Sequence, residues 1–355
     1  MVVPQLVPKG ASRRRRVLSV AVPMVAAVLV LAGCSSGKAA TGGDTSAASS
    51  GSKSSTGKTL SIVMIGGASS DPFFSSIKRG ADDAAAAYGT KVKLTYLGPQ
   101  NYNNLGPDIA KLEETALSQN PSIVVSPDWV EASQDSAFKQ IVAKNIPVVL
   151  YNSGGTSAAT AVGALTYIGT DEYGSGKTGG ETFTKDGSKN VLCVNTVPGA
   201  TNTEARCKGL KDGITAGGGK STELSLPSST FGNPSAVTQA IKAALLKDPS
   251  IDGLMTIGTA DADSASAAIK SANATKVKLG TFGLATSTLT RIQSGDQAFA
   301  LDLQPYLQGF LSVSAAYQYV AFGLLAPANP NLTGPLVIDK SNVSVAIKGA
   351  AAGVR

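Results

Sequence analysis

TLSIVMIGGASSDPFFSSIKRGADDAAAAY, residues 59–88, carries the pattern that sets the architecture of this chain. Its first seven residues, Thr59 to Ile65, form a short β-rich apolar run, and a Gly/Ser loop follows. This composition predicts a buried strand. From Pro72 to Tyr88 the apolar residues recur at helical spacing, which predicts a helix. The segment is therefore predicted to be one β-α unit.

The strand-then-helix alternation continues to residue 150 and restarts after residue 164. In the first run we predict strands at 91–97, 122–125 and 148–150, and helices at 105–119 and 131–143. In the second run we predict helices at 172–183, 203–216, 234–246 and 262–272, and strands at 190–194, 222–226, 253–257 and 277–282. Such alternation favours parallel sheets covered on both faces, with ligands at the carboxyl ends of the strands. Two runs in tandem predict an α/β fold with two Rossmann-like lobes around one cleft.

The N-terminal segment has the composition of an export signal. Residues 13–36, RRRRVLSVAVPMVAAVLVLAGCSS, join a basic cluster to an apolar run. The run is shorter than the ~20 residues that a membrane-spanning helix needs, which predicts a signal peptide over residues 1–33. The ending Leu31-Ala32-Gly33-Cys34 resembles the lipobox of bacterial lipoproteins, which implies lipid on Cys34. A plain secretory signal with an incidental Cys34 is the alternative, and SRRRRVL is also compatible with twin-arginine export.

The charge balance argues against a nucleic-acid partner. The 31 basic and 24 acidic residues give +7, but residues 1–33 hold five of the basic groups and no acidic one, which leaves +2. The remaining charges are scattered, whereas a nucleic-acid surface needs clustered Lys and Arg. Residues 34–58 are rich in Gly, Ser, Thr, Ala and Lys without an aromatic residue, which predicts a flexible tether. Residues 59–355 suffice for two domains.

Five segments, taken in order, resemble the ribose-binding branch of the type I periplasmic binding proteins, the solute receptors of ABC sugar importers. They are 62–74 (ending DPFF), SIVVSP at 122–127, NIPVVL at 145–150, RCKGL at 206–210 and DGLMTI at 252–257. The resemblance implies lobes that close on a ligand by hinge motion, with three crossings near 167–170, 304–306 and 332–334. The lobes are then expected to be 59–166 plus 305–332, and 167–304 plus 333–347.

The resemblance also implies ligand-binding residues in the first lobe. In that family aromatic rings cover the apolar C–H face of the sugar and polar side chains bind its hydroxyls. Phe73 and Phe74 match the stacking pair, and Asp71 takes a hydroxyl-binding position that is usually Asn. Asn152 and Ser153 replace a usual Asp-Arg pair, which makes this rim less charged. From the residues alone, core packing of the two Phe residues and helix capping by Asp71 are the alternatives.

In the second lobe, Arg206 falls on the family's ligand-binding arginine, in the same Arg-x-x-Gly pattern. Its five N–H donors suit a polyhydroxylated ligand, and a surface salt bridge is the alternative. Alanine in place of Phe73 or Arg206 is expected to abolish binding without unfolding the protein. Further candidates are Phe231 for the second lobe's aromatic, Asp261 and Asp263 for an Asn-Asp pair, and Asp302 and Gln304 beside Leu303. Several positions that are polar or charged in the family hold less polar or less charged residues here. These replacements favour a ligand that is smaller, deoxygenated or acyclic compared with ribose.

Two further motifs have more than one interpretation. GSGKTG at 174–179 contains a GxGxxG, but position 171 is Asp where a phosphate-binding loop needs Gly, so we predict a crossover loop and a helix start. Cys193 and Cys207 remain once Cys34 is assigned to lipid. Outside the cytoplasm such a pair is expected to form a disulfide worth ~3 kcal/mol. Two buried free thiols are the alternative.

The residue inventory favours a binding protein over an enzyme. The chain has no histidine, which removes the usual triad base and the commonest zinc ligand, and it has no G-x-S-x-G motif. We therefore expect no catalysis, cofactor or metal, although a Ser-Lys or paired-carboxylate hydrolase stays an alternative. The prediction is a monomeric lipoprotein on the outer face of the cytoplasmic membrane. It captures a monosaccharide, deoxysugar or polyol for an ABC permease with a cytoplasmic ATPase. Two further functions stay open: a receptor for a small furanose-like or carbonyl signal, and a sensor that hands its closed form to a kinase or chemoreceptor.

Overall fold

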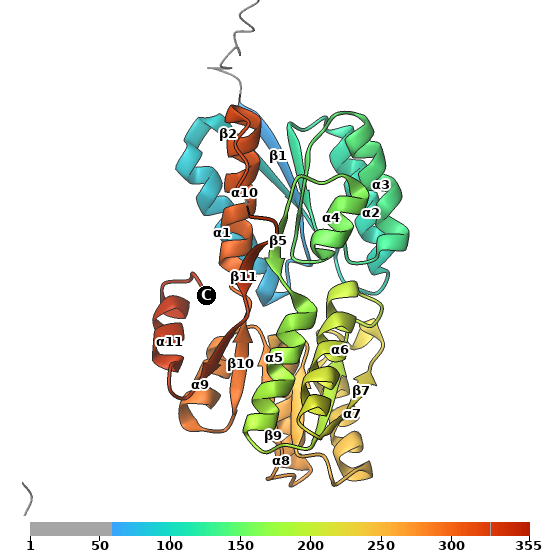
Figure 1. The fold of residues 1–355 in the computed structure, drawn as a ribbon, viewed down its shortest axis with the longest axis vertical. Helices are drawn as coiled ribbons and strands as arrows, with labels where there is room; N and C mark the ends of the chain where they lie inside the picture. The colour runs from blue at the N-terminus through green and yellow to red at the C-terminus, as the bar shows by residue number, and fades with distance from the viewer. Residues whose placement is uncertain (1–58, 327) are drawn as a thin grey trace, which may run out of the picture. The chain divides into compact units, whose positions relative to one another are not determined.

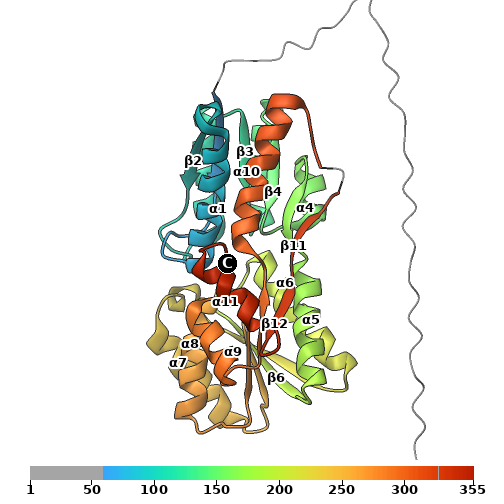
Figure 2. The same cartoon turned by 90° about the vertical axis from the view of Figure 1, so that its left-hand side faces the viewer.

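The structure, a computed structural model, describes residues 59–326 and 328–355. The predicted signal peptide, Cys34 and the predicted tether lie outside the described residues. The described chain forms two six-stranded sheets, each with helices on its faces, as Figures 1 and 2 show. The predicted α/β architecture with two lobes of mostly parallel strands is confirmed.

The first lobe is built on a sheet in which all five strand pairings are parallel, in the order β11-β5-β4-β3-β1-β2. Its strands are β1 (Leu60–Ile65), β2 (Val92–Leu97), β3 (Ile123–Ser126), β4 (Val148–Tyr151), β5 (Tyr167–Thr170) and β11 (Asn331–Gly334). Its helices are α1 (Pro72–Tyr88), α2 (Leu105–Ser118), α3 (Glu131–Ala143), α4 (Gly155–Val162) and α10 (Pro305–Phe322), with a 3₁₀ turn η1 (Gly89–Lys91). Figure 1 shows α1 and α10 side by side on one face of this sheet, and α2, α3 and α4 on the other.

The second lobe has the strand order β12-β10-β9-β8-β6-β7, parallel except where β10 meets β12. Its strands are β6 (Asn190–Asn195), β7 (Lys220–Ser225), β8 (Gly253–Thr256), β9 (Lys278–Phe282), β10 (Phe299–Asp302) and β12 (Leu336–Asp339). Its helices are α5 (Glu172–Lys185), α6 (Thr201–Ala216), α7 (Pro234–Lys247), α8 (Thr259–Ser271), α9 (Thr286–Ser294) and α11 (Val343–Ala351), with a 3₁₀ turn η2 (Ser228–Thr230). The helices pack in pairs: α5 on α6, α7 on α8 and α9 on α11.

The central strands are buried on both faces, and this explains why they appear in the sequence as continuous apolar runs. Every residue of β3, β4 and β8 is buried, and so is every residue of β1 except Ser61. Parallel sheets with helices on both faces leave no solvent-facing side to these strands. Their carboxyl ends are therefore the sheet positions open to a ligand.

The chain passes between the lobes after β5, after β10 and between β11 and β12. Figure 2 shows β11 running directly into β12. The expected boundaries at residues 167 and 333 each cut a strand of the first sheet, because β5 pairs with β4 and β11 pairs with β5. The first sheet therefore reaches Thr170 and Gly334 before the chain crosses.

The glycines of the GSGKTG motif lie where α5 crosses α6. A Cβ on Gly176 would lie 2.1 Å from the carbonyl oxygen of Arg206, and a Cβ on Gly209 would lie 2.1 Å from that of Tyr173. A Cβ atom essentially never lies this close to a carbonyl oxygen that is not bonded to it. The backbones of α5 and α6 can therefore come into contact only because these two positions lack side chains. The motif is thus a helix-packing surface, which agrees with our rejection of a phosphate-binding loop.

Replacing Gly176 with alanine is expected to lower the free energy of unfolding by about 1–3 kcal/mol, because α5 must move away from α6. Gly179→Ala is the matched control in the same helix, since its Cβ would make ordinary contacts of 3.4 to 3.5 Å with side chains. That control is expected to be neutral, or to gain up to about 1 kcal/mol of helix propensity. Urea denaturation of both variants measures the difference, and equal stabilities would contradict the close-packing argument.

Candidate functional site

A pocket lies between the two lobes, at the carboxyl ends of strands from both sheets. It is a cavity of about 80 Å³. The first lobe contributes Asp71, Phe73, Phe74, Tyr102, Leu105, Trp129 and Asn152. The second lobe contributes Val197, Ala200, Asn202, Thr203, Arg206, Phe231, Ile257, Gly258, Thr259, Ala260 and Phe282, and Leu303 lies at the crossing after β10. This is the edge at which open parallel sheets bind their ligands.

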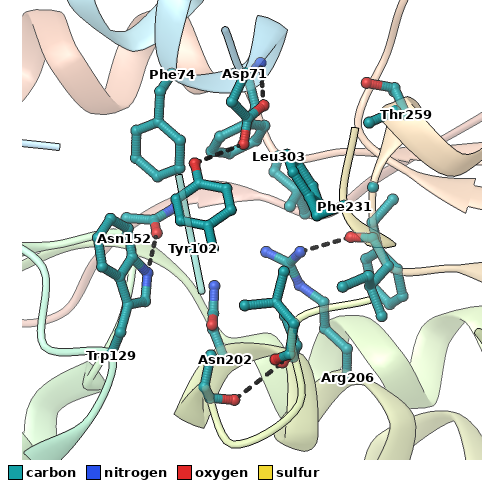
Figure 3. Close-up of a pocket in the computed structure, with 18 of the residues that line it drawn as sticks. Asp71, Phe74, Tyr102, Trp129, Asn152, Asn202, Arg206, Phe231, Thr259 and Leu303 are labelled. Atoms are coloured by element: carbon teal, nitrogen blue, oxygen red, sulfur yellow. Dashed lines mark hydrogen bonds between the residues drawn. The ribbon is translucent and has the colours of Figure 1, made fainter. Parts of the chain in front are cut away.

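Asp71 caps α1 and also lines the pocket. Its Oδ1 accepts a hydrogen bond from the Phe73 amide at 2.9 Å, and its Oδ2 accepts one from the Tyr102 hydroxyl at 2.9 Å, as Figure 3 shows. The Tyr102 oxygen accepts in turn from the Ala68 amide. Burial raises the pKa of Asp71, and the two hydrogen bonds and the charge of Arg206 oppose that rise. Asp71 therefore both caps α1 and lines the pocket.

Five aromatic rings form a connected series along the pocket. Phe73 and Phe74 meet at 5.4 Å between ring centroids, Phe74 and Trp129 at 5.3 Å, Trp129 and Tyr102 at 6.5 Å, and Tyr102 and Phe231 at 4.9 Å. All four pairs are edge-on. Phe74 also belongs to the core of the first lobe, so its core packing and its place in the pocket coexist. The apolar surface needed to cover the C–H face of a sugar is present.

Asn152 has its side-chain amide fixed on both sides. Its Oδ1 accepts from the indole N–H of Trp129 at 3.1 Å, and its Nδ2 donates to Oε1 of Gln308 at 3.2 Å. It adopts a left-handed conformation with φ of 63°, which asparagine tolerates better than most residues. One amide N–H remains for a ligand. The neighbouring Ser153 does not line the pocket.

Arg206 is held by a buried ion pair. Its Nε donates to Oε2 of Glu172 at 2.6 Å, its Nη2 to Oε1 of Glu172 at 3.0 Å, and its Nη1 to the carbonyl of Ile257 at 2.8 Å. The guanidinium also lies over the Phe282 ring at 5.0 Å. Burial raises the pKa of Glu172, and the charge of Arg206 opposes that rise. The alternative of a surface salt bridge was right in that Arg206 pairs with a carboxylate. It was wrong about the location, because both side chains of the pair are only 7% exposed. Two of the five guanidinium N–H groups have no partner among the residues that the structure describes and can bind a ligand.

Asp261 and Asp263 were predicted as site residues, and neither lines the pocket. The Asp261 carboxylate accepts from the Thr196 hydroxyl behind the pocket wall, and its side chain is buried. Asp263 is 61% exposed and pairs with Arg291. The physical reason is that α8 begins at Thr259, so Thr259 and Ala260 of its first turn reach the pocket while Asp263 turns outward.

Asp302 and Gln304 also lie away from the pocket, at the crossing between lobes. Asp302 is fully buried and contacts Arg355 at 2.8 Å, while Gln304 donates to the carbonyl of Thr333. Between them Leu303 points its side chain into the pocket. Successive side chains point to opposite sides here. Asp302 and Gln304 therefore face the crossing between the lobes, and Leu303 faces the pocket.

The lining residues that were not predicted from the sequence include Tyr102, Trp129, Asn202 and Thr259. Trp129 is the one tryptophan of the chain and follows β3 by three residues, so its place after a strand end was an available signal. Asn202 is the second residue of α6, and its buried Oδ1 has no hydrogen-bond partner in the described part of the chain. Tyr102 lies in the loop between β2 and α2, where no spacing rule points to the pocket.

The two cysteines are bridged in the structure. Cys193 in β6 and Cys207 in α6 form a disulfide with a Cα–Cα distance of 5.8 Å. The bridge fixes the helix that carries Arg206 to a buried strand of the second sheet. Across residues 59–326 and 328–355, no three His, Cys, Asp or Glu side chains are placed to hold a metal ion, and no helix is long and apolar enough to cross a membrane.

Comparisons with known proteins agree with this geometry. A family model described as "Periplasmic binding protein domain" matches residues 62–324. A xylose/arabinose-binding protein, XylF from Sulfolobus acidocaldarius, is 25% identical over 305 residues, which are 80% of this chain and 72% of that protein.

Solved structures of similar fold include carbohydrate receptors. A carbohydrate transporter from Acidothermus cellulolyticus in complex with myo-inositol is 32% identical, with a TM-score of 0.77 over 84% of this chain and 100% of that one. GanP, a glucose-galactose binding protein from Geobacillus stearothermophilus, is 21% identical with a TM-score of 0.70, over 80% and 98% of the two chains, and shares the fold.

Proposed function

We propose that this chain, which belongs to the periplasmic binding protein family, captures a monosaccharide, deoxysugar or polyol between its lobes. It then delivers the closed form to an ABC permease with a cytoplasmic ATPase. It performs no chemistry on the ligand. The observation that carries this proposal is the pocket itself, in which aromatic rings face a fixed arginine across the boundary between the lobes.

The pocket chemistry matches the two surfaces of a polyol. The rings of Phe73, Tyr102 and Phe231 offer apolar faces, and the ring C–H groups of a sugar or cyclitol are apolar. Free hydrogen-bonding capacity remains on Arg206 and Asn202 for the hydroxyl rim. The bound myo-inositol of the 32% identical structure supports a cyclic polyol as the first class to test, and XylF supports pentoses.

Direct contacts between the lobes support a closing motion. The amide and the hydroxyl of Thr201 both donate to the carbonyl of Trp129, at 2.8 and 3.0 Å. Trp129 belongs to the first lobe and Thr201 begins α6 in the second. Since Trp129 also lines the pocket, these bonds join the lobes beside the proposed ligand position. Ligand capture is therefore proposed to couple to closure at the three crossings.

The proposed location is the outer face of the cytoplasmic membrane. The export signal and the lipobox-like ending at Cys34 support lipid anchoring, and residues 34–58 would be the tether. A tether of this kind raises the effective concentration of the receptor at its permease. The receptor is proposed to act as a monomer.

Thermal melting of the mature protein against pentoses, hexoses, deoxysugars and polyols tests the proposal. A specific ligand at 100 times its Kd adds about 2.7 kcal/mol to the free energy of unfolding and raises the Tm. Phe73→Ala is expected to remove that shift. Phe322→Ala is the matched control, because Phe322 is 61% exposed at the end of α10 and outside the pocket. A shift with a non-sugar alone, and with no carbohydrate, would refute the assignment.

A further inference from the structure

We infer that the ligand carries a protonated amine, as an amino sugar or an aminocyclitol does, and that this amine binds at Asp71 among the aromatic rings. The inference rests on the proposed function, since it assumes a polyol in the same pocket. It adds a charge to the ligand class, and the charge follows from how the ionised groups of the pocket are partnered.

Two of the residues that line the pocket are charged, Asp71 and Arg206. The charge of Arg206 is compensated, because Glu172 accepts two of its N–H groups in a bidentate pair buried on both sides. Arg206 and Glu172 together are neutral. An anionic ligand would therefore find a guanidinium whose positive charge is already matched, and the residues that line the pocket include no second cation.

Asp71 has hydrogen-bond donors but forms no ion pair among the described residues, although the charge of Arg206 lowers its pKa without direct contact. Its partners are the neutral Tyr102 hydroxyl and the Phe73 amide. Among the ion pairs of residues 59–326 and 328–355, none includes Asp71. The start of α1 favours a negative charge there, yet burial still raises the pKa of Asp71. A partly buried carboxylate that pairs with no cation is unfavourable, so a ligand ammonium would complete the site.

A second carboxylate behind the pocket wall adds to the negative potential. Asp261 is buried, and its carboxylate accepts a hydrogen bond from the neutral Thr196 hydroxyl. Burial raises the pKa of Asp261 to about 6, and the charge of Asp71 contributes to that rise while the Thr196 hydrogen bond opposes it. The two carboxylates therefore lie within electrostatic range of each other. A cation between the lobes would relieve both.

The aromatic rings next to Asp71 favour the same occupant. Tyr102 donates to Asp71, and Figure 3 shows the rings of Phe74 and Tyr102 beside its carboxylate. Ring faces attract a desolvated ammonium. Away from Asp71, two N–H groups of Arg206 and the Oδ1 of Asn202 have no partner among the described residues, and these groups suit hydroxyls. The ligand is thus an amine at one side and a polyol at the other.

Matched pairs of probes test the charge. The titrations compare D-glucosamine with D-glucose and N-acetyl-D-glucosamine, and scyllo-inosamine with scyllo-inositol. Calorimetry is done near neutral pH, where the amines are still mostly protonated and Asp261 is ionised. At least one amine is expected to bind about tenfold or more tightly than its neutral partners. Asp71→Asn is expected to remove this preference and to fold normally, because Asn caps a helix as well as Asp. Asp263→Asn removes an exposed carboxylate outside the pocket and is expected to keep the preference.

The results separate this inference from the proposed function. If the neutral partner binds as tightly as the amine in both pairs, or if another neutral polyol of the melting panel binds while both amines fail, the inference is overturned and the proposed function stands. If no polyol binds, with or without an amine, both are overturned. An amine preference that survives Asp71→Asn would also overturn the assignment to Asp71.

Discussion

Replacing Arg206 with alanine is expected to lower the free energy of unfolding by about 3–5 kcal/mol and to abolish ligand binding, because Glu172 is left buried without its cation. The sequence alone led us to expect loss of binding in a stable protein. The structure changes that expectation, since the arginine is both a pocket residue and half of a buried ion pair. Urea denaturation and calorimetry measure the two effects separately.

Two further variants separate charge from packing. Lys208→Ala removes a cation of the same helix that pairs with Asp212 at the surface, where 68% of the Lys208 side chain is exposed. It should leave the free energy of unfolding nearly unchanged. A double variant with methionine at positions 172 and 206 removes both buried charges and should recover most of the lost stability, while still failing to bind. If Arg206→Ala and Lys208→Ala were equally stable, the buried pair would not have the role argued for it.

Removing the Cys193–Cys207 disulfide is expected to lower the free energy of unfolding by about 3 kcal/mol, from the entropy of closing a short loop in the unfolded chain. For about 300 folded residues that corresponds to a fall in Tm of about 5 °C. Ligand affinity should fall as well, because Cys207 follows Arg206 in α6. The protein carrying Cys193→Ala and Cys207→Ala together provides the measurement.

The control for the disulfide is the response to reductant. Dithiothreitol should lower the Tm of the natural protein toward that of the double variant, and leave the double variant unchanged. A natural protein whose Tm does not respond to reductant, with a double variant that melts at the same temperature, would show that the bridge contributes nothing.

The elements that sequence predicted best are those whose apolar pattern is local. The helix at 131–143 agrees with α3 at both ends, and the strands at 148–150 and 253–257 agree with β4 and β8 within one residue. No element was predicted after residue 282, where the structure has α9, β10, α10, β11, β12 and α11. The strands there are four residues long, and β11 pairs with β5 more than 160 residues earlier. A pairing of that range leaves little trace in local composition.

The predictions of site residues divide in the same way, into those that a local motif supports and those that depend on tertiary structure. The residues that line the pocket and were named from sequence, such as Asp71, Phe73 and Arg206, lie in motifs that resemble a known family. Tyr102 lies in a loop whose position depends on how β2 and α2 are placed, and no periodicity encodes that. The prediction that Asp263 lines the pocket was wrong, because the orientation of its side chain depends on the residue at which α8 begins. A shift of a few residues in a helix start moves a side chain to another face.

The ion pair between Glu172 on α5 and Arg206 on α6 lowers the side-chain entropy that ligand binding would cost. Glu172 begins α5 directly after the β5 crossing, and its carboxylate fixes the rotamer of Arg206 on α6. An arginine that orders only on binding would cost about 0.5–1.5 kcal/mol of side-chain entropy. Here that ordering is completed during folding. The second lobe therefore presents its guanidinium already oriented, and the entropy cost of ordering that side chain does not fall on ligand binding.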